Sequence, residues 1–580
     1  MKKHTKKRGP KLSTRLSRFS RKAEIESREH IKENLIDRAS HIKNIRLLIL
    51  EWGLLIFALI MLAVTQTIWF NNSHSLTSYT NGGTYTEGTL GKVNSLNPLF
   101  ATTSSEKVLS KLLFATLLSV DYSGNPGPSL ASSVDISENG KVWIIKLREG
   151  LKWSDGEPIT NEDVLFTTGL IQNPAVSSVY SSNLTNVKVS ETEDKRISFT
   201  LPTAYADFDT ALYIPILPKH ILGDVPAKTL LEHSFSSKPV SSGAFMFNAV
   251  QTISNEGEKV IYLSANPHYY KGKPLLNSFA VHSYLTRDEL LSDLNRRSLS
   301  ATAELSPADN QQVNKSIFYE KQTLVNSGVY AFLNTSSEVL KNKSIRKAIQ
   351  TGINLEKIRS ATGDDPALNY PLLSSQITLN NYPSIPDYSP DSAKATIYNY
   401  NESLGTTTTL KIATINSGYM PAVANLFADE LKSIGFSTEL SVYEENQDFF
   451  SSVISTRNYD ILIYSIELGS DPDLTAYYHS SRASSSGLNF SDYKNTLVDD
   501  IILGARETTN LDLRIAKYES FLKYWVDDVP AIGIYQPNIS YYYNKNVRTF
   551  SNDNHLITAI DRFADVEDWA VTKVQKNRTP

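Results

Sequence analysis

The sequence contains no cysteine in its 580 residues. This absence excludes disulfide bonds, thiol catalysis, cysteine-ligated zinc, iron–sulfur clusters and a lipid anchor attached through cysteine. The usual catalytic signatures are missing as well, because there is no G-x-S-x-G, H-E-x-x-H, Walker or G-x-G-x-x-G motif. The ten histidines are scattered, and no two of them have the i, i+4 spacing of a helical metal pair. We therefore expect no cofactor, no bound metal and no enzymatic activity.

Glycine and proline number only 26 and 24, which excludes collagen-like and low-complexity chains. Positive charge is concentrated at the N-terminal end of the chain. Residues 1–46 hold 15 lysines and arginines against 5 aspartates and glutamates, whereas the whole chain has a net charge of −3. A basic tail on an acidic body is typical either of nucleic-acid binding or of the cytoplasmic flank of a membrane helix.

The segment after the basic tail favours the membrane interpretation. Residues 47–70 form a 24-residue apolar run whose only charge is Glu51, and roughly 20 apolar residues span a bilayer. Trp52 and Trp69 bracket the run, and basic residues precede it, as in helices whose N-terminus stays inside. We predict a single-pass protein in the cell membrane with a cytoplasmic segment 1–46 that contacts lipid and binds no nucleic acid. The remainder of the chain is then extracellular.

A cleaved secretory signal is the alternative, but a basic leader of 46 residues and an apolar run of 24 exceed the usual dimensions. For residues 12–46 two interpretations stay open. Their helical spacing allows an amphipathic helix on anionic lipid, and their polarity allows a disordered arm. Residues 71–83 are polar and predict a linker.

The extracellular part predicts an α/β fold, because strand-like apolar runs alternate with helix-like patterns. The expected strands are 142–147, 259–263, 278–284, 461–466 and 531–535. The expected helices are 342–360, 420–435 and 511–528.

Residues 97–164 carry a specific order of motifs, including LREGLKWSDGEP and the TNEDV that follows it. This order resembles the extracellular solute-binding proteins of peptide ABC transporters, the oligopeptide/dipeptide-binding family 5. Later segments are similar to further family motifs, and the resemblance covers residues 84–565. These segments are PVSSGAF from Pro239, NPHYYKG from Asn266 and DPD from Asp471.

The resemblance implies a two-lobe fold of the periplasmic-binding-protein type, with a discontinuous first lobe and a ligand cleft between the lobes. We expect the first lobe at 84–284 and 535–570, the second lobe at 285–534 and a polar tail at 571–580. The implied protein is a monomeric, membrane-anchored receptor that captures extracellular peptides. It delivers them to an ABC permease and, through the permease, to ATPase subunits. The alternatives are a receptor for an oligosaccharide, metal chelate or signalling peptide, and a membrane-anchored hydrolase or adhesin.

The family resemblance also locates a candidate site, with departures. The family acid that pairs with a peptide's ammonium group aligns with Leu468, Ala115 stands where some members have a cleft acid, and 296–300 replaces a G-E-x-D turn. We expect Glu467 to take over the ammonium and the end of strand 461–466 to offer main-chain groups to an extended peptide. Asp471, before Pro472, is expected to be a turn residue. The predicted ligand-binding residues are Glu467, Leu468, Gly469, Ser470, Ser465, Ser242 and Gly243.

Overall fold

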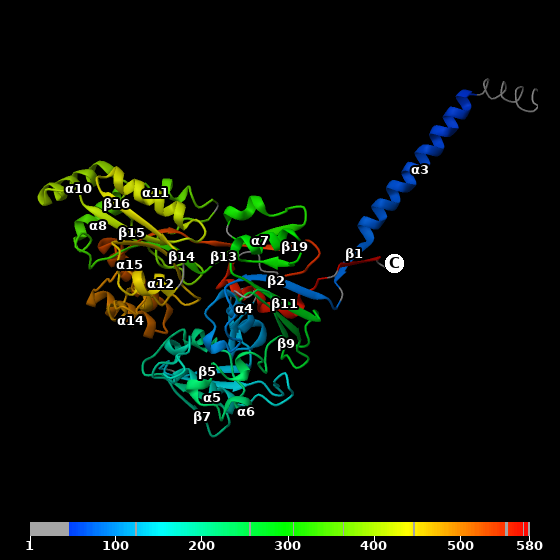
Figure 1. The fold of residues 1–580 in the computed structure, drawn as a ribbon, viewed down its shortest axis with the longest axis horizontal. Helices are drawn as coiled ribbons and strands as arrows, with labels where there is room; N and C mark the ends of the chain where they lie inside the picture. Colours follow the sequence, from blue (N-terminus) through cyan, green and yellow to red (C-terminus); the bar gives the residue numbers. More distant parts are fainter. Residues whose placement is uncertain are drawn as a thin grey trace, which may run out of the picture. The chain divides into compact units, whose positions relative to one another are not determined.

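The computed structural model describes ten stretches of the chain, and residues 1–45 lie outside them, so the conformation of the basic tail stays a prediction. Two compact units are present (Figure 1): one contains the ends of the chain up to Ser78 and from Val574, and the other is Tyr79–Lys573. The described stretches are 46–79, 81–121, 125–137, 139–254, 257–305, 307–363, 365–444, 447–550, 555–571 and 573–577.

The first unit is dominated by α3 (Arg46–His74). Its window Leu50–Thr67 has a mean hydropathy of 1.7, so its length and composition suffice to cross a membrane, as those of a secretory signal also do. The hydroxyl of Thr65 donates to the Met61 carbonyl at 2.9 Å, which satisfies this polar group inside the helix. The predicted linker differs from the structure: the helix continues to His74, and β1 (Ser75–Tyr79) pairs with β21 (Lys573–Asn577).

The second unit begins with an eight-stranded mixed sheet in the order β20-β13-β19-β12-β2-β11-β10-β9. At its centre β2 and β11 run parallel. Helix α4 (Ser104–Leu113) packs against this sheet and starts with a capping box between Thr103 and Glu106. The strands are β2 (Thr84–Leu90), β9 (Phe245–Thr252), β10 (Lys259–Ala265), β11 (Ser278–Tyr284), β12 (Ala301–Thr302), β13 (Phe318–Val325), β19 (Asn538–Asn544) and β20 (His555–Leu556).

A four-stranded antiparallel sheet, β5-β6-β8-β7, shares one hydrophobic core with the eight-stranded sheet. We call these two sheets and their helices the first lobe. The family motif forms a turn here: Gly156 has φ +96°, and Asp163 caps α5 (Asn161–Gln172) through Thr160. The remaining elements are β3 (Leu118–Val120), β4 (Pro126–Pro128), β5 (Ala131–Ile136), β6 (Val142–Leu147), β7 (Lys188–Glu191), β8 (Ile197–Thr200), α6 (Lys219–Leu222) and α7 (Arg287–Asn295).

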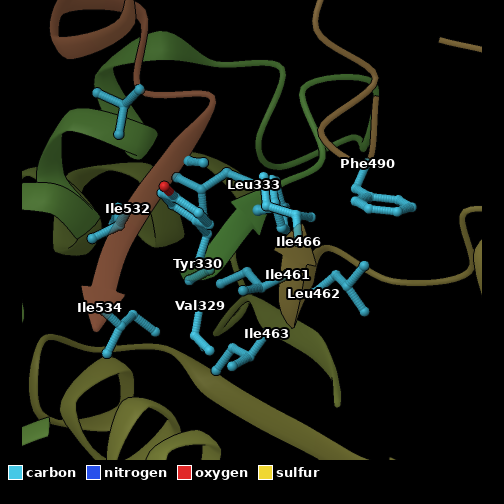
Figure 2. Close-up of a cluster of buried hydrophobic side chains, with 14 of the residues drawn as sticks. Val329, Tyr330, Leu333, Ile461, Leu462, Ile463, Ile466, Phe490, Ile532 and Ile534 are labelled. Atoms are coloured by element: carbon cyan, nitrogen blue, oxygen red, sulfur yellow. The ribbon is translucent and has the colours of Figure 1, made fainter. Parts of the chain in front are cut away.

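The second lobe has its own core around the five-stranded sheet β16-β15-β17-β14-β18. Strands β14 (Ser327–Leu333) and β17 (Ile461–Glu467) pair antiparallel, and Figure 2 shows their apolar side chains packed with those of β18 (Ala531–Tyr535). Their near-continuous apolar sequences are those of strands buried on both faces. The flanking elements are α8 (Lys343–Gly352), α9 (Leu355–Arg359), α10 (Pro390–Leu404), α11 (Met420–Ser433), α12 (Gln447–Phe449), α13 (Thr475–Tyr478), α14 (Thr496–Glu507), α15 (Leu511–Asp528), β15 (Thr409–Ile415) and β16 (Ser437–Tyr443).

The single helix predicted over 342–360 is two helices in the structure. Helix α8 ends at Gly352, and Asn354 starts α9 by accepting from the Lys357 amide at 3.0 Å. An asparagine that caps a new helix competes with continuation of the old one. The pattern therefore gave the right residues but missed the break.

The chain passes from the first lobe to the second at Asn326, between β13 and β14, and returns between Tyr535 and Asn538. The first crossing thus differs from the one predicted near Tyr284. Strands β12 and β13 both pair with β19, so residues 285–325 are part of the first lobe and not of the second. The reason is long-range pairing with β19, more than 200 residues away, which a local pattern cannot reveal.

Candidate ligand-binding site

The loop that ends β17 is bound to the crossing residue Asn326. The Leu468 amide donates to the Asn326 carbonyl at 2.7 Å, and the Asn326 side-chain amide donates to the Gly469 carbonyl at 2.7 Å. On its other side, the Asn326 backbone amide donates to the Leu556 carbonyl of the first lobe at 3.2 Å. The predicted site residues 467–470 therefore lie directly at the hinge between the lobes.

The carbonyl groups of this loop accept hydrogen bonds from the chain itself. Tyr477 donates to the Glu467 carbonyl at 2.5 Å, and the side-chain amide of Gln376 donates to the Leu468 carbonyl at 2.7 Å. Gly469 has φ +65°, which makes the sharp turn after the strand. The expectation that these main-chain groups are offered to an extended peptide thus does not describe this conformation, in which internal partners use the carbonyls.

The side chains of the loop point to different environments. Glu467 is exposed, Ser465 is half-buried on β17, and Leu468 is only 6% exposed within the core of the second lobe. Leu468 thus packs inside this core, and whether it contacts ligand stays a prediction. Ser470 lies beside Tyr213 of the first lobe, and burial together with the nearby Asp209 raises the pKa of Tyr213.

The other predicted pair, Ser242 and Gly243, lies in the first lobe against the end of α4. The Ser242 hydroxyl accepts from the Ala115 amide at 3.0 Å. A Cβ on Gly243 would come within 2.5 Å of the Leu112 carbonyl oxygen, and its own carbonyl accepts from Asn266 at 2.9 Å. Both residues therefore serve close packing of the chain against itself, and whether they contact ligand stays a prediction.

A polar cluster between the lobes was not foreseen as such. Tyr205 of the first lobe donates to the Asp471 carboxylate at 2.5 Å, and Arg514 of α15 binds both Asp471, at 2.9 Å, and Asp207 of the first lobe. Asp471 is 8% exposed. The expectation that Asp471 is a simple turn residue is therefore incomplete, because its carboxylate is buried at the interface between the lobes.

Further contacts extend this interface. The Ala206 amide donates to the Arg506 carbonyl at 3.0 Å, and the Arg506 guanidinium lies 4.2 Å from the Tyr205 ring centre. Burial and the neighbouring Asp207 raise the pKa of Asp209 to about 6.

The sequence contains one signal for this cluster. Arg514 shares a face of α15 with buried Tyr518 and Phe521, at the i+4 and i+7 positions. An arginine on an otherwise apolar helix face requires a buried acid, since an unpaired buried charge is costly. The sequence pattern does not identify the acid, because Asp207 is more than 300 residues away.

In the described stretches, no group of three or more His, Asp or Glu side chains is placed to hold a metal ion. His220 pairs with Asp155 at 2.9 Å beside the family turn.

Comparisons with known proteins agree with this architecture. Residues 125–487 match the model of the bacterial extracellular solute-binding proteins, family 5. The oligopeptide-binding protein AppA of Bacillus subtilis is 26% identical over 494 residues, which are 79% of this chain and 87% of that protein. Its structure in complex with a nonapeptide superposes with a TM-score of 0.71 at 23% identity, covering 85% of this chain and 100% of that one.

A second solved structure extends the range of ligands found on this fold. NikZ from Campylobacter jejuni, in complex with Ni(L-His), has a TM-score of 0.72 at 22% identity and covers 84% of this chain and 99% of its own. At such identity the likeness concerns the fold alone. Together with the match over most of the two lobes, these findings identify the family: the chain belongs to the bacterial extracellular solute-binding proteins, family 5.

Proposed function

We propose that this protein is the membrane-anchored receptor of an ABC importer and that its ligands are peptides. The observation that carries the proposal is the family match over residues 125–487 on a two-lobe fold. Curated relatives at 26% identity are named as oligopeptide-binding and di/tripeptide-binding proteins. Energy for transport comes from partner ATPase subunits, and the chain itself acts by binding and not by catalysis.

The two places where the chain crosses between the lobes allow a binding mechanism in which the lobes close around the ligand. In the part of the chain that the structure describes, two short connections, at Asn326 and after Tyr535, join the lobes, so the lobes can rotate as rigid bodies. A ligand that contacts both lobes favours the closed arrangement by its extra affinity for that state. The permease then distinguishes the closed receptor from the open one.

Glu467 is our candidate for the group that anchors the peptide's free amino end. Its side chain is exposed at the end of β17, one residue before the loop bound to Asn326. A carboxylate there can accept a charge-assisted hydrogen bond from an ammonium group. Buried Leu468 cannot, because it has no acceptor.

Helix α3 is our candidate for the anchor, with residues 1–46 on the cytoplasmic side. The support is its apolar window Leu50–Thr67 and the basic residues before it. Intact protein should remain with membranes after a carbonate wash and should retain Met1. A mature N-terminus mapped after Phe70 would show that the helix is a cleaved signal.

The test of the ligand class is mass spectrometry of small molecules released from the purified full-length chain. Peptides, recovered unchanged after incubation with the protein, are the expected result. A metal chelate or an oligosaccharide in their place would overturn the peptide assignment while leaving the receptor fold intact. Shortened peptides after incubation would instead indicate hydrolysis.

A further inference from the structure

Away from the crossings between the lobes, three direct contacts involve one short segment of the first lobe, Tyr205–Asp207. This segment follows β8 of the four-stranded sheet and lies against α14, α15 and the loop at Asp471. Its three residues each bind the second lobe, through the Tyr205 hydroxyl, the Ala206 amide and the Asp207 carboxylate. The contacts alternate between side chain and main chain, so the whole segment is held.

The partners in the second lobe also pair with acids of their own lobe. Arg514 already pairs with Asp471 inside the second lobe at 2.9 Å, and Arg506 pairs with Asp473 at 3.5 Å. Opening would break the contacts to Tyr205, Ala206 and Asp207 and leave these two pairs in place. The Arg514 side chain, 8% exposed here, would regain water on opening, as would the 31% exposed Asp207 side chain.

The two lobes also approach each other at a second place in the same interface. At the hairpin turn between β5 and β6, a Cβ on Gly140 would lie 3.3 Å from the Thr509 methyl group in the connection between α14 and α15. Gly140 has φ +66°, so the tight turn keeps a side chain out of this approach. The four-stranded sheet thus meets the second lobe along two neighbouring loops.

We propose that the Tyr205–Asp207 segment and Arg514 form a latch that holds the lobes closed without any ligand bound. In this arrangement the closed state is populated at rest, and the ligand adds to a preference that the protein already has. Weakening the latch lowers the closed fraction and raises the apparent dissociation constant by the same factor. Only this effect on affinity rests on the proposed receptor function.

The decisive measurement is the distance between the lobes in ligand-free protein. Because the chain has no cysteine, Lys188→Cys on the four-stranded sheet and Lys394→Cys on α10 introduce two spin labels at exposed positions without competing thiols. Double electron–electron resonance would be recorded on the full chain in lipid nanodiscs, after mass spectrometry has verified that no ligand remains. Wild-type protein should show a major short-distance population.

Asp207→Asn is the principal variant, because it removes the charge that meets Arg514 across the interface and leaves the Arg514–Asp471 pair in place. It should shift the ratio of closed to open by about tenfold or more, as expected for loss of a charge-assisted contact. Tyr205→Phe, which removes a single hydroxyl, should shift the ratio in the same direction. The matched control is Asp194→Asn, an exposed acid of the same lobe that pairs only within it, with Arg196 at 2.6 Å.

Two results would overturn the latch. One is ligand-free wild-type protein that shows only the long distance, and the other is an unchanged distribution in both Asp207→Asn and Tyr205→Phe. Circular dichroism and urea unfolding of each variant separate opening from misfolding, and Tyr205→Phe retains the test if Asp207→Asn does not fold. The measurement needs no ligand, so it succeeds or fails independently of the peptide assignment.

Discussion

The ion pair between Glu87 of β2 and Arg562 of the C-terminal segment Ala559–Asp568 yields the sharpest stability prediction. Glu87 is 0% and Arg562 2% exposed. The Arg562 Nε and Nη2 atoms donate to Glu87 Oε1 at 3.0 and 2.7 Å, and Tyr541 donates to Oε2 at 3.1 Å. The pair thus fixes the end of the chain to the centre of the eight-stranded sheet.

Arg562→Met should lower the free energy of unfolding by about 3–5 kcal/mol, because it leaves a carboxylate buried without its cation. Burial already raises the pKa of Glu87 despite the arginine. In the variant this pKa rises further, so the folded state takes up a proton that the unfolded state releases. The loss should therefore grow as the pH is raised above the ordinary glutamate range.

The double variant Glu87→Gln/Arg562→Met removes both charges and keeps an acceptor for Tyr541. It should recover most of the loss, to within about 1–2 kcal/mol of wild type. The control is Arg196→Met, whose partners Asp135 and Asp194 are exposed, with an expected loss below about 1 kcal/mol.

Urea unfolding of the full chain in detergent, followed by tryptophan fluorescence, measures all of these variants. Trp569 reports on this region because it packs near Tyr541, with ring centres 6.4 Å apart. A loss below 1 kcal/mol for Arg562→Met, or a double variant no more stable than the single one, would refute the reasoning that an uncompensated buried charge dominates.

Three further predictions concern the candidate site and its surroundings. Glu467→Gln should weaken binding of one tight peptide by about ten- to a hundredfold in calorimetric titration. The control Asp391→Asn, at an exposed position, should leave the affinity unchanged. Equal affinities for Glu467→Gln and wild type would exclude the ammonium anchor. The pKa of Asp209 is raised from 3.8 to about 6, so the folded state loses stability as the pH rises from about 4 to 6. Asp209→Asn should remove this loss, which is about 1–2 kcal/mol after allowance for partial exposure. An unchanged pH profile of urea unfolding in the variant would contradict this prediction. Gly243→Ala should destabilise the first lobe by several kcal/mol or prevent folding, because its Cβ would meet the Leu112 carbonyl oxygen at 2.5 Å, and a wild-type melting curve would disprove that close approach.

Strong local patterns predicted several elements of the fold. The run 461–466 became β17, and the proline-first, glycine-last pattern of 420–435 became α11. Residues 296–300 show why a missing motif can mislead. Arg297 adopts φ +65° there, so the turn forms with an arginine in the left-handed region that glycine usually occupies.

The candidate site was harder to predict, for two physical reasons. The loop residues were located correctly at a strand end, but their hydrogen-bond partners Gln376 and Asn326 lie about 90 and 140 residues earlier. The buried acid Asp471 depends on Arg514 and on Asp207, which comes from the other lobe. Periodicity reports the face of one element, and it carries no information on which distant side chain meets that face.

The side-chain amide of Asn326 lies at the crossing between the two lobes and contacts both of them. Asn326 donates to Gly469 at 2.7 Å, and its oxygen accepts from Ser375 at 2.7 Å and from His555 of the first lobe. Because this one side chain contacts both the first lobe and the loop 467–470, rotation of one lobe should change the hydrogen bonds that hold the loop. The opening angle and the geometry of this loop are therefore coupled. A substitution that alters how far the receptor opens should also alter how the loop contacts the ligand.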